Sequence, residues 1–142
     1  MNNVLILKTA SDVVLHKLFE ELKNEDSKKY CFIQSSLINK FQKEYVEIEF
    51  IDIHQEGFYN ISDSVLEEIK KISFAEIYIP TTSPRAINFG NILDLVCNLN
   101  YEKIIFFNCN GEKKEIKKKQ KWEEKIIKLY ILLIQIMYRQ GN

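Results

Sequence analysis

The sequence predicts a single-domain, three-layer α/β fold built on a five-stranded parallel sheet. Short runs rich in β-branched and aromatic residues alternate with longer segments whose apolar residues recur at helical spacing. This alternation is typical of parallel sheets in which helices join successive strands. The length of 142 residues, with 46% apolar and 28% charged residues, fits one domain with a substantial core.

Five segments have the composition of strands. They are residues 4–7, 30–34, 46–53, 76–79 and 103–108. The first, fourth and fifth are almost wholly apolar, as expected where helices cover both faces of a sheet, so we place them centrally. The third alternates apolar residues with Glu47 and Glu49, which predicts a strand at or near an edge.

Amphipathic segments lie between these strands. After the first strand, Val14, Leu15, Leu18, Phe19 and Leu22 fall on one stripe of a helix. The same period recurs in residues 65–72 and 92–99. Each of these segments therefore has one face to bury against the sheet.

The strand order determines where a site can lie. We expect the Rossmann-like order 3-2-1-4-5, and the flavodoxin-like order 2-1-3-4-5 stays open. Ligands of open parallel sheets bind beyond the carboxyl ends of the strands, where the strand order reverses. The first order places the crevice between residues 8–12 and 81–88, whereas the second places it between residues 8–12 and 54–59.

The loop after the first strand reads "KTASD". It contains no glycine, which argues against the dinucleotide and triphosphate cradles that depend on glycine-rich loops. Lys8, Thr9 and Ser11 could still bind an anion together with the first N–H groups of the helix. Asp12 could act as a general base if it opens into a cleft. The more common alternative is that Ser11 or Asp12 simply caps the helix.

The loop after the fourth strand is the second candidate. Pro80 and Pro84 stiffen it, and Arg85 offers the forked donor that suits phosphate. A phosphate or sugar-phosphate site is one interpretation of this loop, and a rigid surface loop is the more common one. The ligand-binding residues predicted from this loop and from the end of the fifth strand are Thr81, Thr82, Ser83, Arg85, Asn88 and Asn108.

Composition excludes several classes of function. Twenty basic and twenty acidic residues leave no net charge, so we expect no nucleic-acid partner. Three distant cysteines without a C-x-x-C pair argue against disulfides and a zinc cluster, and we expect neither a metal nor a cofactor. His54 is a better catalytic candidate than His16, but no nucleophile pattern accompanies either.

The C-terminal part differs from the rest. We divide the chain into an α/β domain, residues 1–111, and one long helix, residues 112–142, that is basic at first and then apolar. Three alternatives explain this helix: burial against the sheet, pairing as a homodimer or with a partner protein, or contact with the membrane interface. We expect neither a secretion signal nor a membrane-spanning segment, and a cytoplasmic location, with any membrane contact at the inner face.

The N-terminal stretch "VLILKTASDVVLH" resembles the start of heptosyltransferase-like glycosyltransferases. In these two-Rossmann-domain enzymes of the cell envelope, the first strand leads into a Ser-Leu-Gly-Asp-Val turn and an early histidine. The leucine and the glycine are absent here, and the resemblance covers about twenty residues. It implies that Asp12 faces an acceptor sugar as the base. A second domain would bind the sugar nucleotide, so the resemblance implies an N-terminal-half relative that is not a complete enzyme alone.

Three functions therefore compete. The first is a module of surface-polysaccharide biosynthesis that binds a phosphorylated sugar, a sugar nucleotide or a partner transferase. The second is a flavodoxin-like protein that binds a free nucleotide or another anion. The third is a structural dimerisation module that acts through its C-terminal helix.

Overall fold

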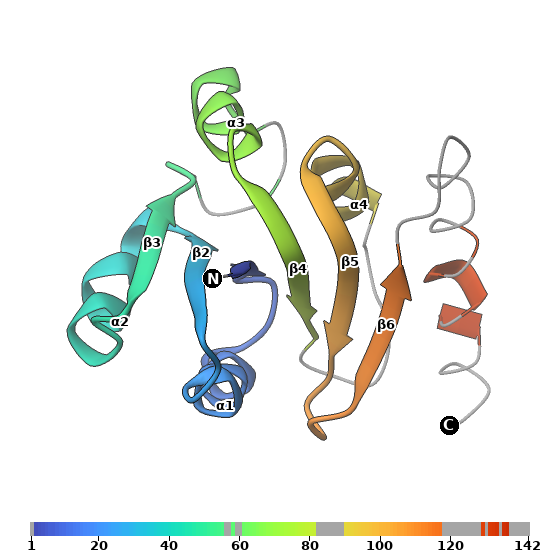
Figure 1. Cartoon of the computed structure of the whole chain (residues 1–142), viewed down its shortest axis with the longest axis horizontal. Coiled ribbons are helices and arrows are strands. Elements are labelled where there is room, and N and C mark those ends of the chain that lie inside the picture. Colours follow the sequence, from blue (N-terminus) through green and yellow to red (C-terminus); the bar gives the residue numbers. More distant parts are fainter. Residues whose placement is uncertain are drawn as a thin grey trace.

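Six strands form one mixed sheet in the order β3-β2-β1-β4-β5-β6 (Figure 1). The structure is a computed structural model that describes residues 2–55, 58, 61–81, 90–117, 129, 131–133 and 135–136, with the backbone alone at residues 90, 91 and 93. The first five strands are parallel, and the last is antiparallel to its neighbour. The strands are β1 (Asn2–Leu7), β2 (Ser27–Ile33), β3 (Ile48–Asp52), β4 (Ser73–Pro80), β5 (Asn100–Phe107) and β6 (Lys113–Lys117).

The order 3-2-1-4-5 predicted for the first five strands is confirmed. The flavodoxin-like alternative is wrong, because β1 pairs with β2 and β4 while β3 pairs with β2. The predicted edge position of the third strand is also correct. This strand begins later than predicted, at Ile48 instead of Val46, whose side chain is 84% exposed.

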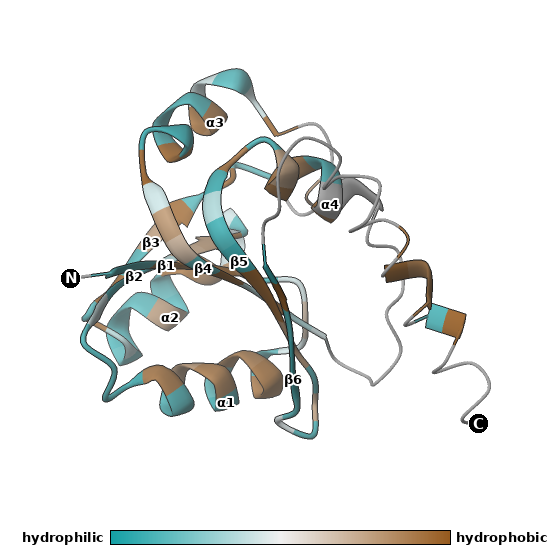
Figure 2. Ribbon diagram, turned by 45° about the vertical axis from the view of Figure 1, so that its right-hand side comes forward, coloured by the Kyte–Doolittle hydropathy of each residue, from teal (hydrophilic) through white to brown (hydrophobic). Residues whose placement is uncertain are grey.

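Helices cover both faces of the sheet, so the fold has three layers (Figure 2). On one face lie α1 (Asp12–Leu22) and α2 (Ile38–Glu44), the latter preceded by the short 3-10 helix η1 (Ser35–Leu37). On the other face lie α3 (Asp63–Lys70) and α4 (Gly90–Cys97). The amphipathic stripes in the sequence account for this arrangement, since their apolar residues are the ones that reach the core.

The central strand β1 shows why its sequence is apolar throughout. Val4 and Ile6 belong to the core cluster beneath α1 and α2, whereas Leu5 and Leu7 belong to the cluster beneath α3 and α4. All four side chains are at most 1% exposed. A strand covered on both faces has no polar side to present, as the sequence predicted.

The strand β6 corrects two predictions. The sheet is mixed and six-stranded, and the predicted C-terminal helix cannot begin at residue 112, because Lys113–Lys117 pairs with β5. Lysine is compatible with an edge strand, where charged side chains reach solvent and discourage pairing with another molecule. Only Ile116 of this strand packs against the core.

The C-terminal residues that the structure describes beyond β6 are helical at positions 129, 131–133 and 135–136. Ile131 is 6% exposed and joins the core cluster beneath α3 and α4. Among the residues described beyond β6 no long helix is shown, and residues 118–128, 130, 134 and 137–142 of the predicted helix lie outside the described part of the chain. Among the described residues, no helix has the length and hydropathy needed to cross a membrane.

Candidate functional site

The strand order reverses between β1 and β4, so the loops that follow these strands meet at the carboxyl edge of the sheet. The Thr9 hydroxyl donates a hydrogen bond to the Pro80 carbonyl over 2.7 Å and links the first loop to the end of β4. The Thr81 amide donates to the Phe107 carbonyl over 2.8 Å, which links the second loop to β5. At this edge the residues after β1 are therefore bonded to the end of β4, and Thr81 is bonded to the end of β5.

A cluster of two lysines and one aspartate lies at this edge. The Lys8 ammonium is 3.2 Å from Asp12 Oδ1, and the Lys40 ammonium is 2.6 Å from Asp12 Oδ2. Lys8 also donates to the Ala10 carbonyl. The Lys8 side chain is only 8% exposed, whereas that of Lys40 is 57% exposed. The Lys8 ammonium is therefore held inside the fold, whereas the Lys40 ammonium extends from α2 and is largely exposed to solvent.

The electrostatics of this cluster keep Asp12 ionised. The hydrogen bond from Lys40 is the largest influence, and together with Lys8 it outweighs desolvation and lowers the pKa of the Asp12 carboxyl. Two positive charges against one negative charge leave the cluster with a net charge of about +1. It lies beside the N-terminus of α1, where the helix dipole also favours an anion.

Ser11 and Asp12, both predicted from the first loop, lie at the start of α1. Ser11 is the N-cap of α1, but its side chain makes no capping hydrogen bond there. Asp12 is the first residue of the helix. The predicted residues Thr82, Ser83, Arg85 and Asn88 lie outside the residues that the structure describes.

Asn108 has a structural role at the end of β5. Its Oδ1 accepts hydrogen bonds from the amides of Asn110 and Glu112 at 3.0 and 2.9 Å, and its Nδ2 donates to Glu112 Oε1 over 3.1 Å. The side chain is 7% exposed. These contacts build the turn that reverses the chain into β6, and Gly111 supplies the positive φ of 78° that the turn requires.

His54 lies beyond the end of β3, away from β1. Asp52 Oδ1 accepts hydrogen bonds from the Ser35 hydroxyl over 2.6 Å and from the His54 amide over 2.7 Å. The His54 ring nitrogen Nδ1 lies 3.5 Å from Asp52 Oδ2. The contact between the Asp52 side chain and the amide two residues later is an Asx turn, and His54 at its end has a left-handed φ of 60°.

Two residues of the carboxyl edge were not predicted from the sequence. Lys40 lies in α2, and nothing in its neighbourhood along the chain marks it as a partner of Asp12. Gln34 directly follows β2, so the same rule that identified the loop after β1 could have found it. Its Nε2 donates to the Lys8 carbonyl over 3.4 Å, while its Oε1 is buried without a hydrogen-bond partner among the described residues.

Comparison with known proteins yields no match for this chain among protein-family models, curated proteins or solved structures. Within the described part of the chain, no group of three histidine, cysteine, aspartate or glutamate side chains is arranged to hold a metal ion.

Proposed function

We propose that this protein is a non-catalytic α/β module that binds a phosphorylated sugar at the carboxyl edge of its sheet. The observation that carries the proposal is the pair of lysines, Lys8 and Lys40, that converge on Asp12 where the strand order reverses. A phosphate needs cationic donors at a fixed position, and Lys8 provides one because it is buried.

Asp12 occupies the position that an incoming phosphate would take. Because Lys40 is more than half exposed, it can leave the carboxylate and pair with a ligand without disturbing the core. The ligand then gains a cation from α2 and the positive end of α1. In this proposal Asp12 tunes the affinity for the anion by competing with it.

The lowered pKa of Asp12 supports binding over catalysis. A general base works best when its pKa is close to the operating pH, and the two lysines move the pKa of this carboxyl in the opposite direction. The resemblance of the first twenty residues to envelope glycosyltransferases supports a sugar as the ligand. We therefore place the module in surface-polysaccharide biosynthesis as an accessory protein.

Calorimetric titration with sugar phosphates, sugar nucleotides and inorganic phosphate tests this proposal. We expect Lys40→Met to weaken the binding of the best ligand about tenfold, the effect of one lost hydrogen bond to a charged group. Asp12→Asn should strengthen it, because it removes the competing carboxylate. The matched control is Lys43→Met, which removes the same charge from the same helix and should leave the affinity almost unchanged.

Two results would reject the proposal. One is that no phosphorylated ligand binds the wild-type protein. The other is that Lys43→Met weakens binding as much as Lys40→Met does, because the effect would then follow the overall charge of the protein and not the geometry of the cluster.

The exposed side chains of the C-terminal segment favour a second candidate function, self-association. Leu129, Leu132, Leu133 and Ile136 are between 39% and 56% exposed, and their spacing places them on one stripe of a helix. Ile131 from the same segment packs against the core. The chain has no net charge to keep copies apart, so we propose that a second copy covers this stripe.

Sedimentation equilibrium tests self-association. We expect a dimer that Leu132→Glu converts to a monomer, because the substitution places a charge within the apolar stripe. Val46→Glu is the control, since Val46 is also exposed but lies on the far side of the sheet, just before β3. A wild-type protein that stays monomeric at every concentration would refute the dimer.

A further inference from the structure

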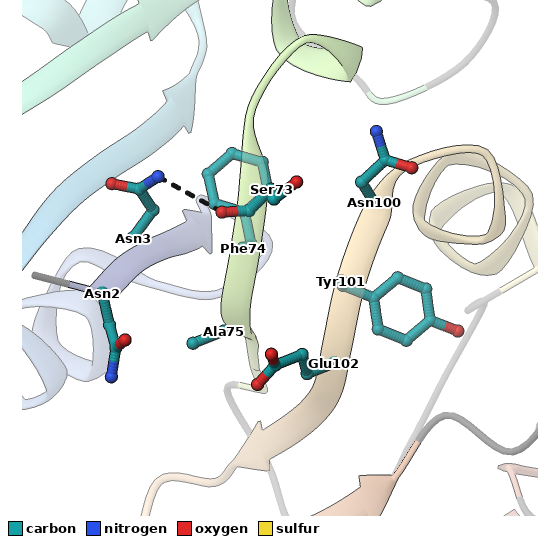
Figure 3. A pocket seen from close by; sticks show the side chains of 8 residues that line it. All are labelled: Asn2, Asn3, Ser73, Phe74, Ala75, Asn100, Tyr101 and Glu102. Atoms are coloured by element: carbon teal, nitrogen blue, oxygen red, sulfur yellow. Dashed lines mark hydrogen bonds between the residues drawn. The ribbon is translucent and has the colours of Figure 1, made fainter.

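We propose a second binding site, for a neutral polyhydroxylated molecule the size of a monosaccharide, at the opposite edge of the sheet. A cavity of about 370 Å³ opens there among the first residues of β1, β4 and β5 (Figure 3). It lies at the amino ends of the parallel strands, so it is separate from the cluster at their carboxyl ends. Its volume falls within the range of small-molecule sites.

The cavity forms because β1 and β4 do not pair at their first residues. The ladder between β1 and β4 joins only Val4–Ile6 of β1 to β4, beginning at Glu76, although β4 itself begins at Ser73. Asn2 and Asn3 therefore pair with β2 on one side, while their other side faces a gap. The Asn3 amide spans part of this gap, donating a hydrogen bond to the Ser73 carbonyl over 3.2 Å.

A matched irregularity in β4 and β5 enlarges the gap. The ladder between these strands contains the pairs on either side of Ala75 and Glu102 but not that pair itself. Phe74 and Ile77 lie in the same core cluster although they are three residues apart, and residues on one face of a regular strand are an even number apart.

In β5, Tyr101 and Ile104 likewise lie in one core cluster although they are three residues apart. The alternation of side chains between the two faces therefore shifts by one residue at the same level in both strands, where the pair Ala75 and Glu102 is missing from the ladder. Such irregularities redirect side chains, and Figure 3 shows the Glu102 carboxylate directed from β5 toward Ala75 of β4. The small side chain of Ala75 leaves the hollow open.

The chemistry of the lining points to hydroxyl groups as the ligand. Amides both donate and accept hydrogen bonds, and a carboxylate accepts two from neighbouring hydroxyls. The polar lining residues are Asn2, Asn3, Ser73, Asn100, Tyr101 and Glu102. None of the eight lining residues is basic, and Glu102 contributes a negative charge, so the site disfavours phosphate.

Part of this lining is already held in place. Asn100 donates to the Lys70 carbonyl over 2.7 Å, and Asn3 donates to Ser73. In each case Nδ2 is the donor, which leaves Oδ1 as the atom that accepts from a ligand hydroxyl. A preorganised amide loses less conformational entropy on binding than a mobile one.

Chemical-shift mapping of the full-length protein tests the proposal. The probes are glucose, galactose and mannose, together with glucosamine as a cationic comparison and glucose 6-phosphate as an anionic one. We expect a neutral sugar to bind at millimolar concentration and to shift the backbone amides of Asn3, Ser73–Ala75 and Asn100–Glu102. Glu102→Ala should weaken this binding about tenfold.

The control variant is Glu20→Ala, which removes an equivalent exposed carboxylate from α1 and should leave sugar binding unchanged. Both glutamates are exposed, so neither change should unfold the protein. The proposal is overturned if no neutral sugar shifts these amides, if only glucosamine or the phosphate does, or if the two variants behave alike. Lys40→Met should leave sugar binding at the cavity unchanged. A failure of the cavity proposal can therefore be told apart from a failure of the anion-site proposal.

Discussion

The substitution Asp12→Asn is the most informative perturbation of this protein. It removes the charge that the two lysines share and keeps the shape of the side chain. We expect it to lower the free energy of unfolding near neutral pH while raising the affinity for an anion. Opposite effects on stability and binding distinguish a carboxylate that competes with a ligand from one that only stabilises the first turn of α1.

The expected loss of stability follows from the exposure of each partner. The contact with Lys40 is exposed on both sides and contributes about 0.5 kcal/mol, and an acidic residue in the first turn contributes about the same through the helix dipole. Lys8 would keep only the Ala10 carbonyl. Losing one partner of a fully buried pair costs roughly 3–5 kcal/mol, which we reduce to about 1 kcal/mol because Asp12 is 35% exposed.

The total is about 2 kcal/mol, which corresponds to a decrease of roughly 6 °C in the melting temperature of a domain this size. Urea unfolding across pH measures the effect. Because the pKa of Asp12 is lowered from 3.8, its contribution to stability is present above that value and is lost as the pH falls below it. The difference between wild type and Asp12→Asn should therefore be constant between about pH 5 and pH 8 and shrink below about pH 4.

A difference that does not shrink in acid would refute this reasoning, because it could not come from the carboxylate charge. Equal stability of the two proteins at neutral pH would refute it as well. A double-mutant cycle with Lys8→Met assigns the share that belongs to the buried lysine. The same cycle with Lys40→Met should give a coupling energy of less than about 1 kcal/mol.

Two further predictions concern residues outside the cluster. Asn108→Ala should lower the free energy of unfolding in urea by about 2–3 kcal/mol, because it leaves the amides of Asn110 and Glu112 without their acceptor. A loss below about 0.5 kcal/mol would contradict the role of Asn108 in this turn. Tyr45→Phe should cost about 1 kcal/mol, because the Tyr45 hydroxyl lies 2.7 Å from His16 Nδ1. Burial and nearby glutamates raise the pKa of Tyr45 from 10.0 to about 12, so wild type should lose stability between these values, and Tyr45→Phe should lose less.

The sequence predicted the first five strands because the central ones are buried on both faces and the third alternates as an edge strand does. Their apolar runs and the amphipathic segments between them admit few other arrangements. The strand β6 was missed because it buries little beyond Ile116, so its sequence has no strand pattern. It is held in the sheet by backbone hydrogen bonds with β5, and such bonds do not require a particular pattern of side chains.

The sequence pointed to two members of the carboxyl-edge cluster but not to the third, and it did not predict the cavity at the amino edge. Asp12 and Lys8 could be identified because they follow a strand, whereas Lys40 depends on how α2 packs beside α1. A signal for the cavity does exist in the sequence. "FAEI" in β4 and "YEKI" in β5 both place an aromatic residue three positions before an isoleucine, where regular alternation requires an even spacing.

The cluster at the carboxyl edge and the cavity at the amino edge differ in charge, and this difference yields a final prediction. The carboxyl edge presents Lys8 and Lys40 around Asp12, whereas the lining of the amino-edge cavity contains Glu102 and no basic residue. If both proposals hold, glucose 6-phosphate and glucose should shift amides at opposite ends of the same strands. Added salt should weaken the first interaction, because it screens exposed charges such as Lys40, and should leave the second almost unchanged. Equal salt dependence at both edges would show that charge does not separate the two sites.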